Sequence, residues 1–309
     1  MAPFRKCGGK RLLTGATLAF LSCFVAARDA FAYCQTSICE LGNSGAVCTP
    51  ALESDCGLPL FWKERCIGFS VQKDGSQFFS SELLAGLVSQ AFTVWTSAEC
   101  DEGGRPQLFV TRQADAECAF PEYNIDRNVN KGNANVVMFR DEGWPYPGFE
   151  DTFALTTLTY HTETGEIYDA DIEINTADVV FTTSDSDIVY DLASTIQHET
   201  GHFLGIAHSP EVASPMFPLP EFGITRRELS PDDVAAICNI YPPEAKALDA
   251  SCSPVPHDFS PLCNHTLAEP SEAEDGCSAS RAPAGGGTAV WLALASFAAS
   301  ARRRRRRSS

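Results

Sequence analysis

The sequence predicts an α/β (α+β) domain built on a twisted mixed sheet, with an internal helix that carries a pair of histidines and a C-terminal helix. Two observations support this fold class. Short alternating runs between residues 66 and 175 are typical of strands, and apolar residues recur at helical spacing between Ser80 and Ser97. The domain is expected to span residues 66–243, which is long enough for a hydrophobic core of its own.

The first elements follow in chain order. Residues 67–71 alternate as a strand does, and residues 80–97 form the first helix. The apolar face of this helix is expected to be core, and its members are Leu83, Leu84, Leu87, Val88, Ala91, Phe92 and Trp95. Further strand-like runs lie at residues 107–112, 135–140, 154–161 and 166–175.

The next helix, predicted from about residue 188 to residue 204, carries the most informative motif of the chain. From His198 to His208 it reads H-E-x-x-H-x-x-G-x-x-H. Residues four apart share a helix face, so His198 and His202 can bind one ion while Glu199 reaches a water on it. Gly205 can adopt the positive φ that ends a helix, which lets the chain turn and bring His208 back as a third ligand.

Three protein ligands leave one position of a tetrahedral zinc site open. Structural zinc sites are closed by four ligands, usually with cysteine, whereas an open site holds a water whose pKa falls to about 7. The motif therefore predicts one catalytic zinc ion and a hydrolase. Glu199 is not needed to hold the metal, which favours an active site over a zinc site kept by a protein that only binds.

A Pro-rich loop and a last helix complete the domain. The loop, residues 215–220, contains Met216. The last helix begins with Ser230 as its cap and Pro231 in its first turn, where a missing N–H is tolerated. Residues 244–276 shift to Ala, Glu, Ser and Pro without periodicity and are interpreted as a linker.

The first 32 residues have the features of a secretory signal peptide. Basic residues precede an apolar run and a small-residue site that predicts cleavage between Ala32 and Tyr33, with lipoprotein processing at Cys23 as the alternative. A Cys-rich segment, residues 33–65, follows. We therefore expect an exported protein, located outside the cell or on its outer surface.

Residues 277–309 form a different kind of tail. Cys277 and small residues precede a weakly apolar stretch, residues 285–301, and six arginines, Arg302 to Arg307. About 17 such residues are marginal for spanning a bilayer, which favours a transient anchor over a permanent one. This order is similar to the MYXO-CTERM sorting signal of myxobacterial surface proteins, which implies processing at Cys277. A simple tail anchor is the alternative.

Removing both ends makes the chain strongly acidic. Of 23 Lys and Arg, 11 remain beside 39 of 40 Asp and Glu, a formal charge near −28. Such a surface would repel phosphates, so no nucleic-acid partner is expected. It either offers oxygen ligands for calcium or serves to keep an exported monomer soluble.

Cysteines agree with export. Apart from Cys7, Cys23 and Cys277, ten of the 13 cysteines remain, an even number that suggests disulfides. They are Cys34, Cys39, Cys48, Cys56, Cys66, Cys100, Cys118, Cys238, Cys252 and Cys263. Their connectivity does not follow from the sequence.

The histidine motif and the methionine after it resemble the metzincin zinc endopeptidases, and the details resemble the matrixin branch. In that branch the third histidine is followed by Ser, here Ser209, and the methionine by an aromatic residue and Pro, here Phe217 and Pro218. The matrixin patterns L-S-x-D-D and I-x-x-I-Y are matched between Leu229 and Tyr241.

The resemblance implies a metzincin-like protease domain and a role for each site residue. The zinc ligands would be His198, His202 and His208. Glu199 would be the general base, and Met216 would form a tight turn beneath the metal. Residues 217–229 would wall the pocket for the side chain that follows the scissile bond. A polypeptide substrate would lie extended along the strand at residues 154–161.

Upstream the resemblance is weaker. Matrixins generally hold a second, structural zinc with histidines before the active helix, and only His161 is present there, so that zinc is not expected. Asp169 and Asp171 lie where the family places calcium ligands, although their alternation also fits a strand with one wet face. Cys56 stands in a C-G-x-P element that blocks the metal in some zinc proteases, but we favour a disulfide for it.

The sequence thus predicts a secreted or surface-anchored zinc endopeptidase. Two other classes stay open. A zinc-binding adhesin or binding module would be unaffected by replacement of Glu199, and a zinc amidohydrolase acting on cell-wall peptides would leave unfolded proteins intact.

Overall fold

The computed structural model describes residues 35–37, 58–101, 103–117, 120–121, 134–147, 151–243 and 252–254, together with the backbone of residues 289–296. The expected signal peptide, nearly all of the segment 33–57, most of the linker and Cys277 lie outside the described residues, as does Cys56.

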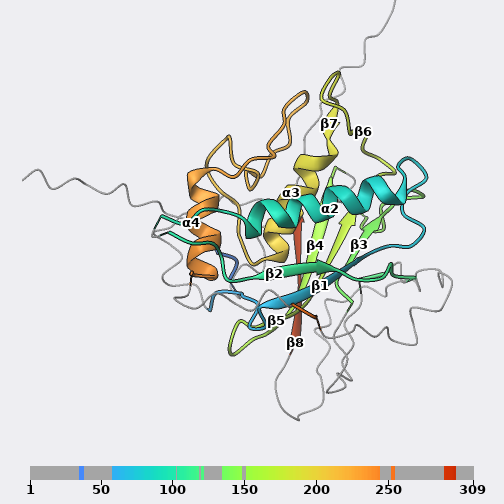
Figure 1. Ribbon diagram of the computed structural model, residues 1–309. Coiled ribbons are helices and arrows are strands. Elements are labelled where there is room, and N and C mark those ends of the chain that lie inside the picture. The colour runs from blue at the N-terminus through green and yellow to red at the C-terminus, as the bar shows by residue number, and fades with distance from the viewer. Residues whose placement is uncertain are drawn as a thin grey trace, which may run out of the picture. The chain divides into compact units, whose positions relative to one another are not determined.

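The main sheet is mixed and has the strand order β2-β1-β3-β5-β4-β8 (Figure 1). Its strands are β1 (Cys66–Val71), β2 (Phe109–Arg112), β3 (Val136–Phe139), β4 (Ala154–His161), β5 (Ile167–Ile174) and β8 (Ala289–Ser296). β2, β1, β3 and β5 are parallel, whereas β4 is antiparallel to β5. The predicted fold class is confirmed, and β4 has the predicted bounds. β2 begins later than predicted because the amide of Gln107 is bonded to the carbonyl of Tyr241 instead.

Two helices cover one face of this sheet. α2 (Ser81–Thr96) packs on β1 and β2, α3 (Leu192–Phe203) packs on β4 and β5, and the helices contact each other (Figure 1). Ser80 caps α2 as predicted, since its side chain accepts from the amide of Leu83. Leu83 itself is 39% exposed and does not belong to the core, contrary to the expectation for this face.

α3 begins at Leu192, so the start predicted near residue 188 is wrong. Tyr190 and Asp191 are extended and form β7 (Tyr190–Asp191), which pairs with β6 (Phe181–Thr182). The Asp191 carboxylate then accepts from the amide of Ser194 at 2.8 Å and caps the helix. This cap fixes the orientation in which the helix enters the site.

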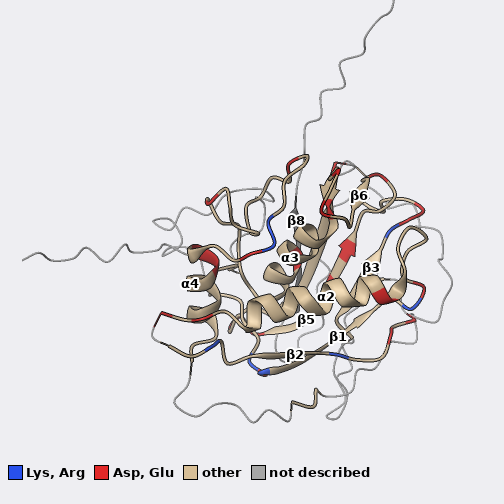
Figure 2. Cartoon of the chain, turned by 45° about the horizontal axis from the view of Figure 1, so that its top comes forward, with Lys and Arg blue, Asp and Glu red and all other residues tan. Residues whose placement is uncertain are grey.

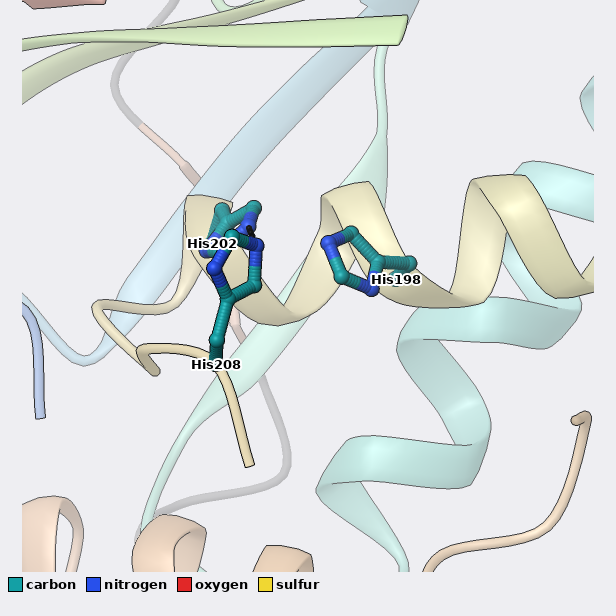
Figure 3. A group of neighbouring side chains, drawn as sticks. All are labelled: His198, His202 and His208. Atoms are coloured by element: carbon teal, nitrogen blue, oxygen red, sulfur yellow. Dashed lines mark hydrogen bonds between the residues drawn. The ribbon is translucent and has the colours of Figure 1, made fainter. Parts of the chain in front are cut away.

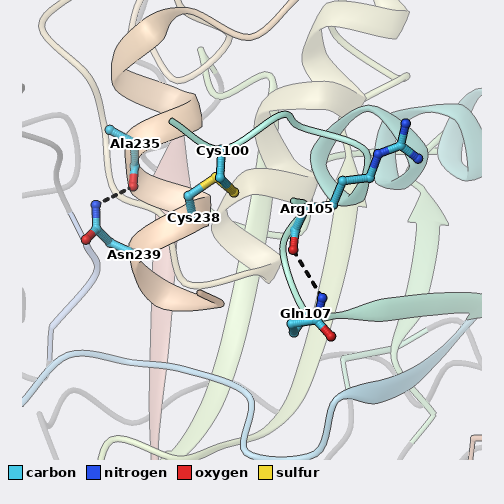
Figure 4. The surroundings of a disulfide bond; sticks show 6 residues. All are labelled: Cys100, Arg105, Gln107, Ala235, Cys238 and Asn239. Carbon is cyan, nitrogen blue, oxygen red and sulfur yellow. Dashed lines mark hydrogen bonds between the residues drawn. A yellow bond between two sulfur atoms is a disulfide. The ribbon is translucent and has the colours of Figure 1, made fainter. Parts of the chain in front are cut away.

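α4 (Pro231–Ile240) begins as predicted, with Ser230 as cap and Pro231 in the first turn. Its other end is tied to the chain after α2 by the disulfide Cys100–Cys238 (Figure 4). A second disulfide joins Cys66, at the start of β1, to Cys252. These bonds supply connectivity that the sequence left open.

The apolar stretch near the C-terminus contributes β8, which pairs antiparallel with β4 along its whole length, from Ala154 opposite Ser296 to His161 opposite Ala289. β8 therefore covers the outer edge of β4. Among the described residues, no helix has the length and apolar character needed to cross a membrane. The transient anchor and the sorting tail stay predictions.

Candidate metal centre

Three histidines converge where α3 ends and the chain turns back (Figure 3). The Nε2 atoms of His202 and His208 are 3.2 Å apart, and one ring nitrogen of each histidine lies within 4.8 Å of the others. His198, His202 and His208 are all buried. Two nitrogens bound to one tetrahedral zinc ion at 2.0–2.1 Å would be about 3.3 Å apart, so the spacing of His202 and His208 suits such an ion.

The backbone fixes the tautomer of two of these rings. The Nδ1 of His198 lies 2.6 Å from the carbonyl of Pro215, and the Nδ1 of His202 lies 2.8 Å from the carbonyl of Ile206. A carbonyl oxygen only accepts, so each Nδ1 carries the proton and donates it. Nε2 is then left as a lone-pair donor for a metal, which is how such outer partners usually orient a histidine ligand.

Burial keeps the rings of His198 and His202 neutral. Desolvation, and next the neighbouring histidines, lower the pKa of His198 well below its ordinary value. Desolvation, and next the charge of His208, lower the pKa of His202 to about 3. Neutral imidazoles are the form that binds metals, so the donor set fits a zinc ion.

Gly205 makes the turn that brings His208 to the site, as predicted. Its φ is 87°, a left-handed value that favours glycine. The amide of Ile206 bonds the carbonyl of Gly201 and the amide of Gly205 bonds that of His202, which is a Schellman ending. A Cβ at Gly205 would also lie 2.5 Å from the carbonyl oxygen of Leu60, so glycine is required twice over.

Glu199 is fully buried beside the histidines and is held from the sheet. The hydroxyl of Thr156, on β4, donates to Oε2 of Glu199 at 2.5 Å. Nothing in the sequence identified Thr156, because the contact depends on how α3 crosses β4. A threonine in a run that is otherwise typical of a strand carries no local signal of such a role.

Met216 lies against α3, the helix that carries His198 and His202. A Cβ added to Gly201 of α3 would come 2.3 Å from Met216 Sδ and 2.8 Å from the Trp95 ring, so the sulfur occupies the space that glycine leaves open. Met216 is fully buried, and its amide donates to the Ser214 hydroxyl oxygen at 2.8 Å. Met216 therefore packs directly against α3, and its role beneath a metal stays a prediction.

Acidic residues in the first turn of α4, where the ribbon is red in Figure 2, accept hydrogen bonds from both loops of the site. The Ser209 hydroxyl donates to Asp232 at 2.6 Å, and the Ser214 hydroxyl donates to Asp233 at 2.7 Å. Ser209 follows the third histidine, and Ser214 precedes Met216. The L-S-x-D-D pattern located these aspartates on the helix but gave no sign of these bonds.

His161 is the last residue of β4, as its position predicted. Its Nδ1 accepts from the amide of Glu163 at 3.1 Å, and its ring lies edge-on to Tyr168. Among the described residues, the side chains that lie at metal-ligand spacing are His198, His202 and His208. His161 is not part of this group.

The alternative that residues 165–175 form a strand with one solvent-exposed face is wrong. Asp169, Asp171 and Glu173 on β5 are at most 1% exposed. Asp171 accepts from the amide of Val136 at 2.8 Å, and Glu173 is paired with the Arg140 guanidinium. Calcium binding at Asp169 and Asp171 stays a prediction.

Comparison with known proteins agrees with this geometry. A family model described as Matrixin matches residues 61–242, more than half of the chain. The chain is also similar to Metalloendoproteinase 1-MMP of Arabidopsis thaliana, with 28% identity over 190 residues. These residues cover 60% of this chain and 45% of the plant protein, so the match spans less than half of that relative.

Proposed function

The chain belongs to the matrixin family, and on this premise we propose that it is an exported zinc endopeptidase that hydrolyses polypeptides with Glu199 as general base. The observation that carries the proposal is the convergence of three buried imidazoles. Two of them, His198 and His202, are fixed by backbone carbonyls in the tautomer that a metal needs.

The zinc would be held by His198, His202 and His208. When bound, it would polarise the carbonyl of the peptide bond and acidify the attacking water. Glu199 would take the proton that the water loses and deliver it to the leaving amine. The Thr156 hydroxyl would keep the Glu199 carboxylate in place between these two transfers.

The edge of β4 is the proposed place for the substrate backbone. Strand addition gives backbone hydrogen bonds without demanding a sequence, which suits an enzyme that acts on extended polypeptides. β8 is antiparallel to β4 on this edge, and the same polarity is proposed for the substrate. Since β8 covers the same edge, a substrate would have to displace it, and processing at Cys277 would remove it altogether.

The remaining assignments are part of the same proposal. Removal of residues 1–32 would give a mature chain starting at Tyr33, with a protease domain at residues 66–243, a linker at 244–276 and a tail from Cys277. The disulfides Cys66–Cys252 and Cys100–Cys238 support an oxidising location, because such bonds persist outside the cytosol.

Cleavage of an unfolded protein such as casein tests the proposal. The oxidatively folded protein should cut casein, and a chelator or the change Glu199→Ala should abolish the cut. Glu82→Ala, an exposed carboxylate on α2, serves as the matched control and should leave the rate unchanged. If casein stays intact although each chain binds one zinc, the endopeptidase proposal is wrong. The binding module is then favoured, or the amidohydrolase if cell-wall peptides are cut.

A further inference from the structure

A small pocket opens beside His198. Its walls come from α3, through Ser194 and Thr195, and from the loop after Met216, through Phe217 and Ile224. The open space inside it is about 30 Å³. An apolar cavity that takes a benzene ring measures roughly 150 Å³, so this pocket has room for about one methyl group or one water.

Arg226 forms part of the pocket wall. This side chain is 9% exposed and lines the pocket, with its guanidinium 5.1 Å from the centre of the Phe217 ring. Its Nε donates to the carbonyl of Val212 at 2.6 Å, and a terminal nitrogen donates to the carbonyl of Leu219 at 3.1 Å. The other terminal nitrogen binds Glu221 at 2.6 Å.

These hydrogen bonds fix the Arg226 side chain in the pocket wall. The guanidinium joins Val212, which precedes Met216, to Leu219 and Glu221 on the loop after Met216. It cannot swing aside without breaking these hydrogen bonds, which a charged donor makes stronger than neutral ones. The amide of Arg226 is in addition bonded to the Ser194 hydroxyl at 2.7 Å, which ties the same residue to α3. Filling the pocket with a large side chain would therefore require the loop to rebuild.

The pocket is also electrically balanced. Arg226 is paired with Glu221, and Asp191, which lines the same pocket, is paired with Arg227 at 2.5 Å. No uncompensated charge is left among these groups to attract an acidic or basic side chain. Size alone then decides which residue fits.

We propose that this pocket receives the side chain that follows the scissile bond and that Arg226 restricts it to glycine, alanine or serine. This inference rests on the proposed function and adds a substrate class to it. Arg226 is a specificity-determining residue, since its guanidinium occupies the volume that a leucine or phenylalanine side chain would need.

Cleavage sites mapped by sequencing the new N-termini from a mixture of unfolded proteins provide the test. The wild-type enzyme should cut before Gly, Ala or Ser, with kcat/KM for Ala exceeding that for Leu by about 10-fold or more. Arg226→Ala should bring this ratio close to one. Arg112→Ala, which removes an arginine on β2 that does not line the pocket, should keep the wild-type ratio.

Ile224→Ala is a second test variant, because Ile224 lines the pocket. Since Ile224 is 45% exposed, its truncation should have little effect on stability. This variant should admit Val and Leu. Cuts by the wild type before Leu or Phe as often as before Ala, or an Arg226→Ala profile equal to that of the wild type, would overturn the inference.

Binding separates this inference from the proposed function. Zinc-loaded Glu199→Gln should bind a peptide with Ala after the target bond more tightly than its Leu counterpart, and Arg226→Ala in that background should remove the difference. If the wild type cuts nothing but this binding preference is present, the endopeptidase proposal is wrong and the size selection of the pocket stands. Equal binding of both peptides would sink the size selection.

Discussion

The hydroxyl of Thr156 on β4 donates a 2.5 Å hydrogen bond to the carboxylate of Glu199 on α3. Both side chains are fully buried. A buried carboxylate needs donors to stay ionised, and a threonine on the neighbouring sheet supplies one from outside the helix that carries the motif. The proposed general base is therefore positioned by the sheet as well as by its own helix.

Thr156→Val should lower kcat/KM by about 10-fold or more, because a hydrogen bond to a charged group is worth about 1.5–3 kcal/mol and valine has the same shape without a donor. Thr156→Ser keeps the hydroxyl and should retain most of the activity. Steady-state kinetics on a peptide substrate, with thermal unfolding to verify the fold, measure the effect. Equal rates for the Val and Ser variants would show that the hydroxyl does not position Glu199.

Gly201→Ala should destabilise the protein by about 1–3 kcal/mol, because the added methyl would lie 2.3 Å from Met216 Sδ. Gly86→Ala on α2 is the matched control. A Cβ there has nothing within 4 Å, so this change should be stabilising by up to about 1 kcal/mol. Denaturant unfolding measures both, and adding Met216→Ala should restore part of the loss at Gly201. Similar stabilities for the two glycine variants would contradict the tight contact.

Asp233 should make stability depend on pH. Burial raises the pKa of Asp233 to about 6, against the bonds from Ser214 and Ser230 that lower it. A carboxyl whose pKa is higher in the folded state binds its proton more tightly there, so its contribution is full below the ordinary pKa near 4 and is lost as the pH rises through 6.

The free energy of unfolding of the wild type minus that of Asp233→Asn should therefore fall by up to about 3 kcal/mol between pH 4 and pH 7. Urea titrations of both proteins with the metal chelated give this difference, and subtraction removes the titration of all other groups. A difference that stays constant with pH would mean that Asp233 titrates normally.

Zinc should stabilise the fold through the three histidines. A ligand that binds only the folded state at 1,000 times its Kd contributes about 4 kcal/mol, so chelation should lower Tm and added zinc should restore it. Glu199→Ala should bind zinc with unchanged stoichiometry, whereas His208→Ala should lose most of the affinity. His161→Ala, at the end of β4, should bind as the wild type does. Full zinc affinity in His208→Ala would remove this residue from the ligand set.

Removal of the C-terminal tail should raise activity, because β8 covers the edge of β4 that the substrate is proposed to use. A chain ending at residue 276 should have a lower KM than the full chain. The matched control ends at residue 301, which removes the arginines but keeps β8, and it should behave as the full chain does. Equal KM values for all three chains would show that β8 does not occupy the substrate edge.

Local spacing in the sequence was enough for much of the fold and for the composition of the candidate site. Period-2 and period-3.6 patterns located β1, α2 and β4, because side-chain direction along a strand or helix depends on neighbours only a few residues away. The cap Ser230 and Pro231 in the first turn located α4. The same reasoning put His198 and His202 on one helix face, with Glu199 on the same turn, and gave Gly205 the positive φ that the structure has.

Contacts between distant segments were decided by tertiary structure alone. Thr156 reaches Glu199, Gly201 makes room for Met216, and the aspartates of α4 hold the serines beside the third histidine and the methionine. The start of α3 shifted because residues 190–191 pair with β6, and the buried carboxylates of β5 found partners across the sheet.

The sequence by itself therefore determined which residues converge on the candidate metal site, since their spacing is set by a single helix and one glycine turn. The tertiary structure decided what holds them and how large the neighbouring pocket is. Those properties arise from packing between elements far apart in the chain, and no periodicity within one element encodes the distance from Thr156 to Glu199 or the position of the Arg226 guanidinium against the pocket wall.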